Sequence, residues 1–367
     1  MQLIAWHKVT ILNVVPSVLQ ILLADERFTT CGDVRVVFCG GDTLRPEVVE
    51  RFFGQMRAEL YNLYGPTEAT VDATFWRCGL GSRTPSVPIG RPLQNVQAYV
   101  LGQNLQPVPI GVRGELCLGG VGLAWGYCGH PEFTAERFIP HPFHDKPGER
   151  LYRTGDVASY LPDGSIQFLG RVDRQVKIRG NRVEPGEIEA VLRHHAGVRD
   201  VVVVAREDES NEASSAARAG KSLVAYVVPA DGREPSVSQL LDFVREKVPA
   251  YMQPAAFVML GSLPLTANGK VDLSALPPPS GGRPELAEEL VPPRTLVEET
   301  IALAWADLLG VERVGVHDNF FDLGGHSLLA TQVISRLHRA FGVQLPLRVV
   351  FESPTVAELA EAIERAT

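Results

Sequence analysis

The chain has 367 residues, of which 45% are hydrophobic and 21% are charged. This length exceeds what one hydrophobic core usually serves, so we expect two or three globular domains of ordinary composition. The formal net charge of −8 argues against general binding to nucleic acid or to an anionic membrane, because either would need a basic face. The expected partners are small molecules and other proteins.

The cysteines form no CxxC pair and no His/Cys cluster, so the sequence predicts neither a zinc site nor a disulfide framework. The longest apolar stretch, residues 13–24, contains Pro16 and Gln20 and is shorter than the roughly 20 residues that a membrane span needs. The N-terminus lacks the cleavage pattern of a signal peptide. We therefore expect a cytoplasmic protein by default.

Residues 1–171 alternate strand-like and helical runs and predict a mixed α/β region. Residues 34–39 are β-branched and apolar and end before two glycines, which indicates a strand. A helix is expected over residues 45–60, since Pro46 is tolerated in a first turn. Turn signals predict further strands at 97–101, 114–118 and 165–169.

A smaller α+β unit is expected over residues 172–277, with helices at 186–195 and 237–247 and strands at 198–205 and 223–228. Residues 208–221 are polar without an apolar period and indicate a surface loop. Residues 278–293 are rich in Pro and Gly and predict a linker. Apolar spacing at 295–309, 327–341 and 355–365 predicts a four-helix bundle over residues 294–367.

The bundle contains a glycine-rich segment that delivers a serine to the start of a helix. Residues 318–332 read DNFFDLGGHSLLATQ, in which Ser327 follows two glycines and a histidine. A helix N-terminus favours an attached phosphodiester through its free N–H groups and dipole. A serine in this place is also an ordinary N-cap. The whole segment resembles the attachment site of peptidyl carrier proteins, which implies a 4'-phosphopantetheine group on Ser327.

Upstream segments resemble, in the same order, the motifs of the adenylate-forming enzymes in their amino-acid-activating branch. They are YNLYGPTE at 61–68, GELCLGGVGLAWGY at 114–127, LYRTGD at 151–156, LGRVDRQVKIRG at 169–180, PAYMQP at 249–254 and PLTANGKVD at 264–272. Trp125 and Leu273 stand where the family usually has arginine. The order of the motifs, with the carrier behind them, favours a non-ribosomal peptide synthetase.

The resemblance implies a role for particular residues. Tyr64 would stack on adenine, Thr67 would bond the α-phosphate and Glu68 would hold Mg²⁺, an ion that prefers oxygen ligands. Asp156 would accept hydrogen bonds from the ribose hydroxyls of ATP, and Arg171 would contact the ribose and phosphate. Asp173 would be the hinge of the small subdomain, and the catalytic Lys270 would bridge the substrate carboxylate and the α-phosphate. Arg174 and Lys177, taken singly, are more typical of a solvated strand.

Part of the family's amino-acid pocket can be carried over by position. An aspartate among its lining residues favours a polar substrate side chain, because an unpaired buried carboxylate is costly. The lining positions are Asn13, Val37, Cys39, Leu63, Val71, Asp72 and Lys270.

Several hundred residues that open the family's activating domain, including its phosphate-gripping loop, have no counterpart in this sequence. We therefore expect an incomplete adenylate-forming large subdomain (1–171), a small lid subdomain (172–277), a linker (278–293) and a carrier (294–367). Two functions stay open: ATP-dependent amino-acid adenylation followed by thioester tethering on Ser327, which the chain alone would perform poorly, and a carrier and docking module with a vestigial adenylation region. A stand-alone acyl-CoA ligase is disfavoured by the carrier. Expected partners are a phosphopantetheinyl transferase and neighbouring condensation or thioesterase domains.

Overall fold

A computed structural model describes residues 1–81, 86–144, 147–178, 180–207, 221–279, 290–325 and 327–366. The chain divides into two compact units, Met1–Asn181 and Arg182–Thr367, and each is described by itself. Among the described residues no helix is both long and apolar enough to cross a membrane.

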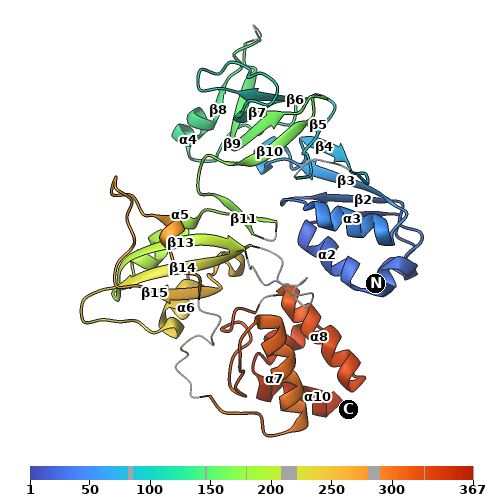
Figure 1. The fold of residues 1–367 in the computed structure, drawn as a ribbon, viewed down its shortest axis with the longest axis vertical. Coiled ribbons are helices and arrows are strands. Elements are labelled where there is room, and N and C mark those ends of the chain that lie inside the picture. The colour runs from blue at the N-terminus through green and yellow to red at the C-terminus, as the bar shows by residue number, and fades with distance from the viewer. Residues whose placement is uncertain are drawn as a thin grey trace. The chain divides into compact units, whose positions relative to one another are not determined.

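The first unit begins with a five-stranded sheet in the order β1-β2-β3-β4-β5 (Figure 1). The first three strands are parallel, and β4 and β5 run antiparallel to their neighbours. Its elements are α1 (Gln2–Trp6), β1 (Ile11–Val14), α2 (Pro16–Ala24), η1 (Glu26–Thr30), β2 (Val36–Gly40), α3 (Pro46–Gln55), β3 (Glu59–Tyr64), η2 (Thr67–Ala69), β4 (Thr74–Arg77) and β5 (Arg91–Pro92).

In the described part of the chain, α2 and α3 cover one face of this sheet. Burial alternates along β3, as expected for a strand with one face on a core. Leu60 lies on the covered face and joins residues of α2 and α3, such as Leu19 and Phe52, in one hydrophobic core. On the opposite face Tyr61 packs beside Phe38 and Phe75, with ring centroids 5.6 and 6.4 Å apart.

The second sheet of this unit is antiparallel, in the order β10-β9-β7-β6, and β8 also pairs with β9. Its elements are β6 (Val96–Leu101), β7 (Gly114–Gly120), α4 (Pro131–Arg137), β8 (Phe138–Pro140), β9 (Arg150–Tyr160) and β10 (Ile166–Arg171). A two-stranded sheet of β11 (Val176–Ile178) and β12 (Asn181–Val183) follows.

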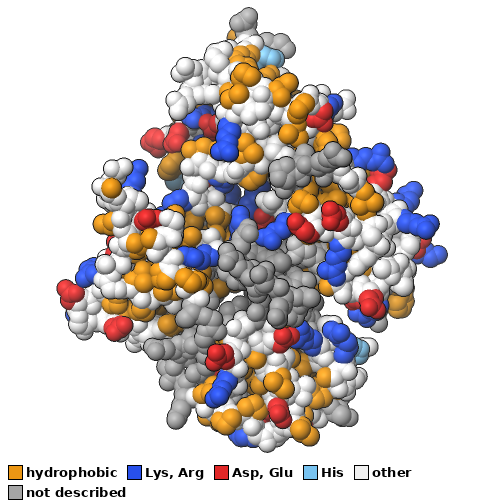
Figure 2. All heavy atoms as spheres, in the orientation of Figure 1, with side chains coloured by type: hydrophobic (Ala, Val, Ile, Leu, Met, Phe, Trp, Pro, Cys, Tyr) orange, Lys and Arg blue, Asp and Glu red, His pale blue; other side chains and the backbone are white. Residues whose placement is uncertain are grey.

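The second unit contains a three-stranded sheet in the order β13-β14-β15. Buried residues of α5 and α6 include Ile188, Leu192, Leu240 and Val244. Figure 2 shows hydrophobic side chains over β14 and β15. The partly buried Val258 packs against a core that includes Val224 and Tyr226. The elements are α5 (Pro185–Arg193), β13 (Val198–Glu207), β14 (Lys221–Pro229), α6 (Val237–Arg245), η4 (Ala250–Met252), β15 (Ala256–Met259) and η5 (Leu273–Ala275).

The rest of this unit is helical, and its helices share one core around Trp305 and Phe320, whose rings lie 5.0 Å apart. Thr295 caps the first helix by accepting a hydrogen bond from the Glu298 backbone N–H. The helices are α7 (Leu296–Leu309), α8 (Ser327–Phe341), α9 (Arg348–Glu352) and α10 (Val356–Ala366).

Most predicted elements lie within a few residues of their expected bounds, but the helix predicted over 45–60 is wrong beyond Gln55. The chain turns extended at Met56 (φ −121°, ψ 146°), and Glu59–Tyr64 is a strand. The alternating burial of Leu60, Asn62 and Tyr64 is the strand signal that the helical interpretation missed. Most of the predicted loop at 208–221 and of the linker at 278–293 lies outside the described residues.

Candidate functional site

Three of the predicted nucleotide-binding residues meet in the first unit. Tyr64 is the last residue of β3, Asp156 lies in β9, and the antiparallel register sets Arg171 of β10 opposite Asp156. The Tyr64 hydroxyl donates to one oxygen of the Asp156 carboxylate, and Arg171 Nη1 donates to the other. Asp156 is buried. Strand pairing therefore brings together residues that are far apart in the sequence.

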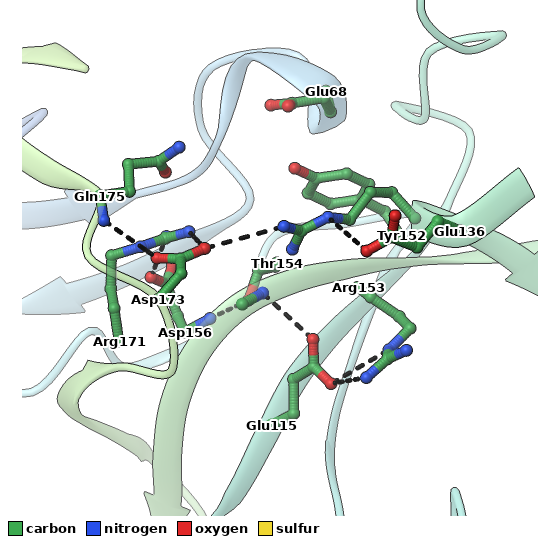
Figure 3. A network of polar contacts seen from close by, with 12 residues as sticks. Glu68, Glu115, Glu136, Tyr152, Arg153, Thr154, Asp156, Arg171, Asp173 and Gln175 are labelled. Carbon is green, nitrogen blue, oxygen red and sulfur yellow. Dashed lines mark hydrogen bonds and ion pairs between the residues drawn. The ribbon is translucent and has the colours of Figure 1, made fainter. Parts of the chain in front are cut away.

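The network continues to the predicted hinge (Figure 3). Arg171 donates from Nε to Oδ1 of Asp173 at 2.6 Å and from Nη2 to Oδ2 at 2.8 Å. Burial alone would raise the pKa of Asp173, but the hydrogen bonds and charge of Arg171 outweigh it and hold that pKa below its ordinary value. Asp173 is therefore a carboxylate at neutral pH.

The hydroxyl at the other end of the network stays protonated. Burial, together with the charge of Asp156, raises the pKa of Tyr64 well above its ordinary value. The Nζ of Lys177 lies 5.5 Å from the centroid of the Tyr64 ring, within the range of a cation–π contact. Tyr64 is thus fixed at its hydroxyl and contacted on its ring.

Glu68, the predicted Mg²⁺ ligand, is buried in η2 next to the exposed Thr67. Tyr127 donates its hydroxyl hydrogen to Oε1 of Glu68 at 2.7 Å, and this orients the carboxylate. The turn before η2 needs a glycine, since a Cβ at Gly65 would lie 2.4 Å from the Val71 carbonyl oxygen. Carboxylate and hydroxyl oxygens fit Mg²⁺. No group of three or more His, Cys, Asp or Glu in the described part of the chain could hold a metal.

The predicted amino-acid pocket is not assembled on one face. Val37 and Cys39 are fully buried on the face of β2 that α2 and α3 cover. Asn13 pairs with Phe38 and therefore lies on the opposite face. Leu63 shares that face with Tyr61.

Two more of the lining positions, Val71 and Asp72, follow η2. Val71 is 67% exposed in a left-handed conformation (φ 69°), and Asp72 is half-buried. Burial raises the pKa of Asp72. The backbone after η2 therefore presents these two side chains from a tight loop.

Lys270 lies in the second unit at the end of a tight turn. Gly269 adopts φ +75°, and the Thr266 N–H donates to the Lys270 carbonyl at 2.7 Å. The Lys270 side chain is exposed. The turn leaves this ammonium in solvent.

Ser327 is the first residue of α8, so it follows the glycines as the sequence predicted, but its side chain and His326 lie outside what the structure describes. The loop before it is tightly packed. A Cβ on Gly325 would lie 2.4 Å from the Phe320 ring, and Asp318 accepts a hydrogen bond from the Gly315 N–H at 2.8 Å. This packing constrains the backbone of the loop that leads into α8.

Sequence reasoning missed three contacts. Tyr127 was included only as the end of a glycine-rich motif, Lys177 was interpreted as solvated, and Arg137, which approaches Asp173, was not considered. No local signal distinguishes these residues, since each contact joins elements distant in the sequence. Trp125 is 95% exposed, which explains how it replaces the usual arginine without disturbing the core.

Comparison with known families agrees with this geometry. Residues 1–128 match the model of the AMP-binding enzyme, residues 187–270 the AMP-binding enzyme C-terminal domain, and residues 299–363 the phosphopantetheine attachment site. The class is therefore an AMP-binding enzyme region followed by a carrier domain.

Similar curated proteins make the class of this chain more specific. Tyrocidine synthase 3 of Brevibacillus parabrevis is 48% identical over 365 residues, which are 100% of this chain and 5% of that protein. Gramicidin S synthase 2 of Brevibacillus brevis is 44% identical over 98% of this chain and 8% of that protein. Tyrocidine synthase 1 of Brevibacillus parabrevis is 41% identical over 98% of this chain and 32% of its own length. The chain belongs to the non-ribosomal peptide synthetase family and spans a small part of these relatives.

Solved structures of adenylation–carrier proteins also resemble this chain. A holo NRPS protein with adenylation and PCP domains, bound to a vinylsulfonamide inhibitor, matches with a TM-score of 0.77 and 28% identity, over 100% of this chain and 59% of that chain. An artificially fused adenylation–PCP di-domain from Klebsiella oxytoca matches with a TM-score of 0.59 and 31% identity, over 71% and 49%.

Proposed function

We propose that this chain contributes to ATP-dependent activation of an amino acid and to its tethering as an aminoacyl group on phosphopantetheine at Ser327. The observation that carries the proposal is the convergence of Tyr64, Asp156 and Arg171, three residues from separate motifs to which the resemblance assigns one nucleotide. The carrier domain behind the adenylation region supports the second step.

In the first step a carboxylate oxygen of the amino acid attacks the α-phosphorus of ATP, and pyrophosphate leaves with its electron pair. Glu68 would hold Mg²⁺ against the phosphates, while Thr67 would donate to the α-phosphate. Lys270 would stabilise the charge on the pentavalent phosphorus. At about 4 Å and an effective dielectric near 20, one ammonium stabilises a unit negative charge by about 4 kcal/mol.

In the second step phosphopantetheine supplies, when bound, the thiol that receives the aminoacyl group. The acyl–phosphate bond breaks, AMP leaves, and the thiol proton goes to solvent. Rotation about Asp173 would move Lys270 of the small subdomain away from the nucleotide. Another surface of that subdomain would then line the path along which the carrier arm enters. The linker at 278–293 would give the four-helix carrier its reach, and a phosphopantetheinyl transferase would load it.

The isolated 367-residue chain is expected to activate amino acids poorly, since it covers 59% of the matched adenylation–PCP protein and has no counterpart of the family's phosphate-gripping loop. ATP–pyrophosphate exchange across the amino acids tests this. Exchange at the rate of a complete module with any amino acid refutes the expectation, and no exchange together with Ser327 loading leaves the carrier as the active part.

Loading is measured by incubating the chain with a phosphopantetheinyl transferase and coenzyme A and weighing it. We expect one added phosphopantetheine group, absent in Ser327→Ala. An unchanged mass, or a gain that persists in the alanine variant, rejects the carrier proposal.

We further propose a polar amino-acid substrate, because Asp72, which the resemblance implies as a lining residue, is half-buried. A complete homologous module that turned over only aliphatic amino acids would contradict this. A cytoplasmic location and neighbouring condensation or thioesterase domains are proposed from the family. The location is supported by the cysteines, each of which has a free thiol.

A further inference from the structure

The hinge carboxylate contacts a second guanidinium, which comes from a separate element. Arg137 is the last residue of α4, and its Nη2 lies 3.7 Å from Oδ2 of Asp173. Both side chains are 30% exposed, so the contact is only partly screened by water. Arg137 Nε also lies 3.9 Å from Glu136.

The charges around this contact alternate. Asp156, Arg171, Asp173 and Arg137 follow one another as anion, cation, anion and cation. Asp173 also accepts two hydrogen bonds from Arg171, and neither of them involves Arg137. Loss of Arg137 therefore leaves no buried carboxylate without a counter-charge.

The backbone of β9 is shaped for this arrangement. A Cβ on Gly155 would lie 3.0 Å from Arg171 Nη2, 3.0 Å from Asp173 Oδ2 and 3.1 Å from Arg137 Nη1. Gly155 also has φ +73°, which favours glycine. The space left by the missing side chain is where the two guanidiniums and the carboxylate come together.

The two arginines differ in what happens when the chain turns at the hinge. Arg171 is two residues from Asp173, so their bonds are local and can persist through the rotation. Arg137 belongs to α4 and contacts Asp173 only while the hinge lies against β9. The N–H of Val172 donates to the Gly155 carbonyl at 2.9 Å, and the N–H of Gln175 donates to Asp173 Oδ1 at 3.3 Å.

We propose that Arg137 is a positioning residue that clamps Asp173 onto β9 and thereby sets how readily residues 172–178 leave their docked position. The inference rests on the proposed function, in which Asp173 is the hinge of the small subdomain. Arg137 would thus hold the hinge against β9 without being one of the residues proposed to contact the nucleotide.

Hydrogen exchange of the full chain, followed by mass spectrometry, tests the clamp. Arg137→Gln should speed exchange in the peptide covering 172–178 about 2- to 5-fold, the factor expected for a partly exposed ion pair. Arg137→Lys keeps the charge and should restore part of the protection. The matched control is Arg77→Gln, which removes an ion pair to Glu59 elsewhere in the same unit and should leave 172–178 unchanged.

A double-mutant cycle separates a clamp from general loosening. Asp173→Asn should also speed exchange in 172–178, and adding Arg137→Gln should then have little further effect. The clamp is rejected if Arg137→Gln leaves 172–178 unchanged, if it speeds β9 equally, or if its effect is undiminished in the Asp173→Asn background. Failure of Ser327 loading would count against the proposed function but not against this contact, because exchange is read without turnover.

Discussion

Replacement of Asp156 by asparagine should destabilise the first unit strongly while preserving its shape. Asp156 is 5% exposed and accepts from both the Tyr64 hydroxyl and Arg171. Removing one partner of a buried ion pair typically costs about 3–5 kcal/mol. Because Arg171 keeps its bonds to Asp173, and the asparagine oxygen can still accept from Tyr64, we expect about 2–4 kcal/mol.

Urea unfolding measures this loss when tryptophan fluorescence is followed in a Trp305→Phe background, because Trp305 belongs to the second unit and the half-buried Trp76 then reports on the first. The matched control is Asp25→Asn, the same chemical change in an ion pair with Arg27 whose guanidinium is 61% exposed. Exposed pairs contribute about 0.2–1 kcal/mol. Equal losses for the two variants would refute the claim that the buried network stabilises this unit.

Three further outcomes are expected. Gly325→Ala should destabilise the carrier helices by about 2–4 kcal/mol, because the new Cβ would lie 2.4 Å from the Phe320 ring, whereas Gly54→Ala, with no atom within 4 Å, should not; thermal unfolding of each variant compares them. Burial lowers the pKa of His141, so the unfolded chain binds its proton first and stability should fall as the pH drops below about 6.5; His141→Gln should flatten the urea midpoint between pH 7 and 5. Cys128 should be the thiol that a chromogenic reagent modifies in the native chain, with the others reacting only in denaturant, because burial encloses Cys31, Cys39, Cys78 and Cys117.

Burial also suppresses the reactivity of these thiols. It raises the pKa of Cys78 to about 12 and that of Cys117 to about 12, so neither forms thiolate near neutral pH. Modification of more than one thiol in the folded chain would show that one of these cores opens readily.

The spacing of apolar residues predicted those helices and strands in which one spacing runs through the whole element. The carrier helix α8 has the expected bounds, and β6 and β13 begin within one residue of the predicted strands. The helix expected over 45–60 was predicted to end too late, because Leu60 and Tyr64 fit the spacing of a helix as well as the alternation of a strand. β9, the strand that joins three others, was not predicted, since its polar LYRTGD segment hides the apolar period.

The site was predictable as a set of residues but not as a set of contacts. The resemblance nominated Tyr64, Asp156 and Arg171, and the sheets bring them together. It could not indicate that Tyr127 orients Glu68, because that bond depends on how a loop packs. Positional transfer also grouped Val37 with Asn13, although strand alternation puts them on opposite faces.

The lone pairs of Asp156 allow the network and the proposed nucleotide contact to coexist. A carboxylate has two oxygens and about four acceptor positions. One position on each oxygen is used, by the Tyr64 hydroxyl and by Arg171. Within the described part of the chain this leaves room for one further donor on each oxygen, which would suit the two ribose hydroxyls proposed as donors. Nucleotide binding would then add bonds to a carboxylate that is already held in place, so binding would carry little ordering cost. Arg171 also pairs with Asp173, so the carboxylate proposed to bind the ribose and the proposed hinge share one guanidinium.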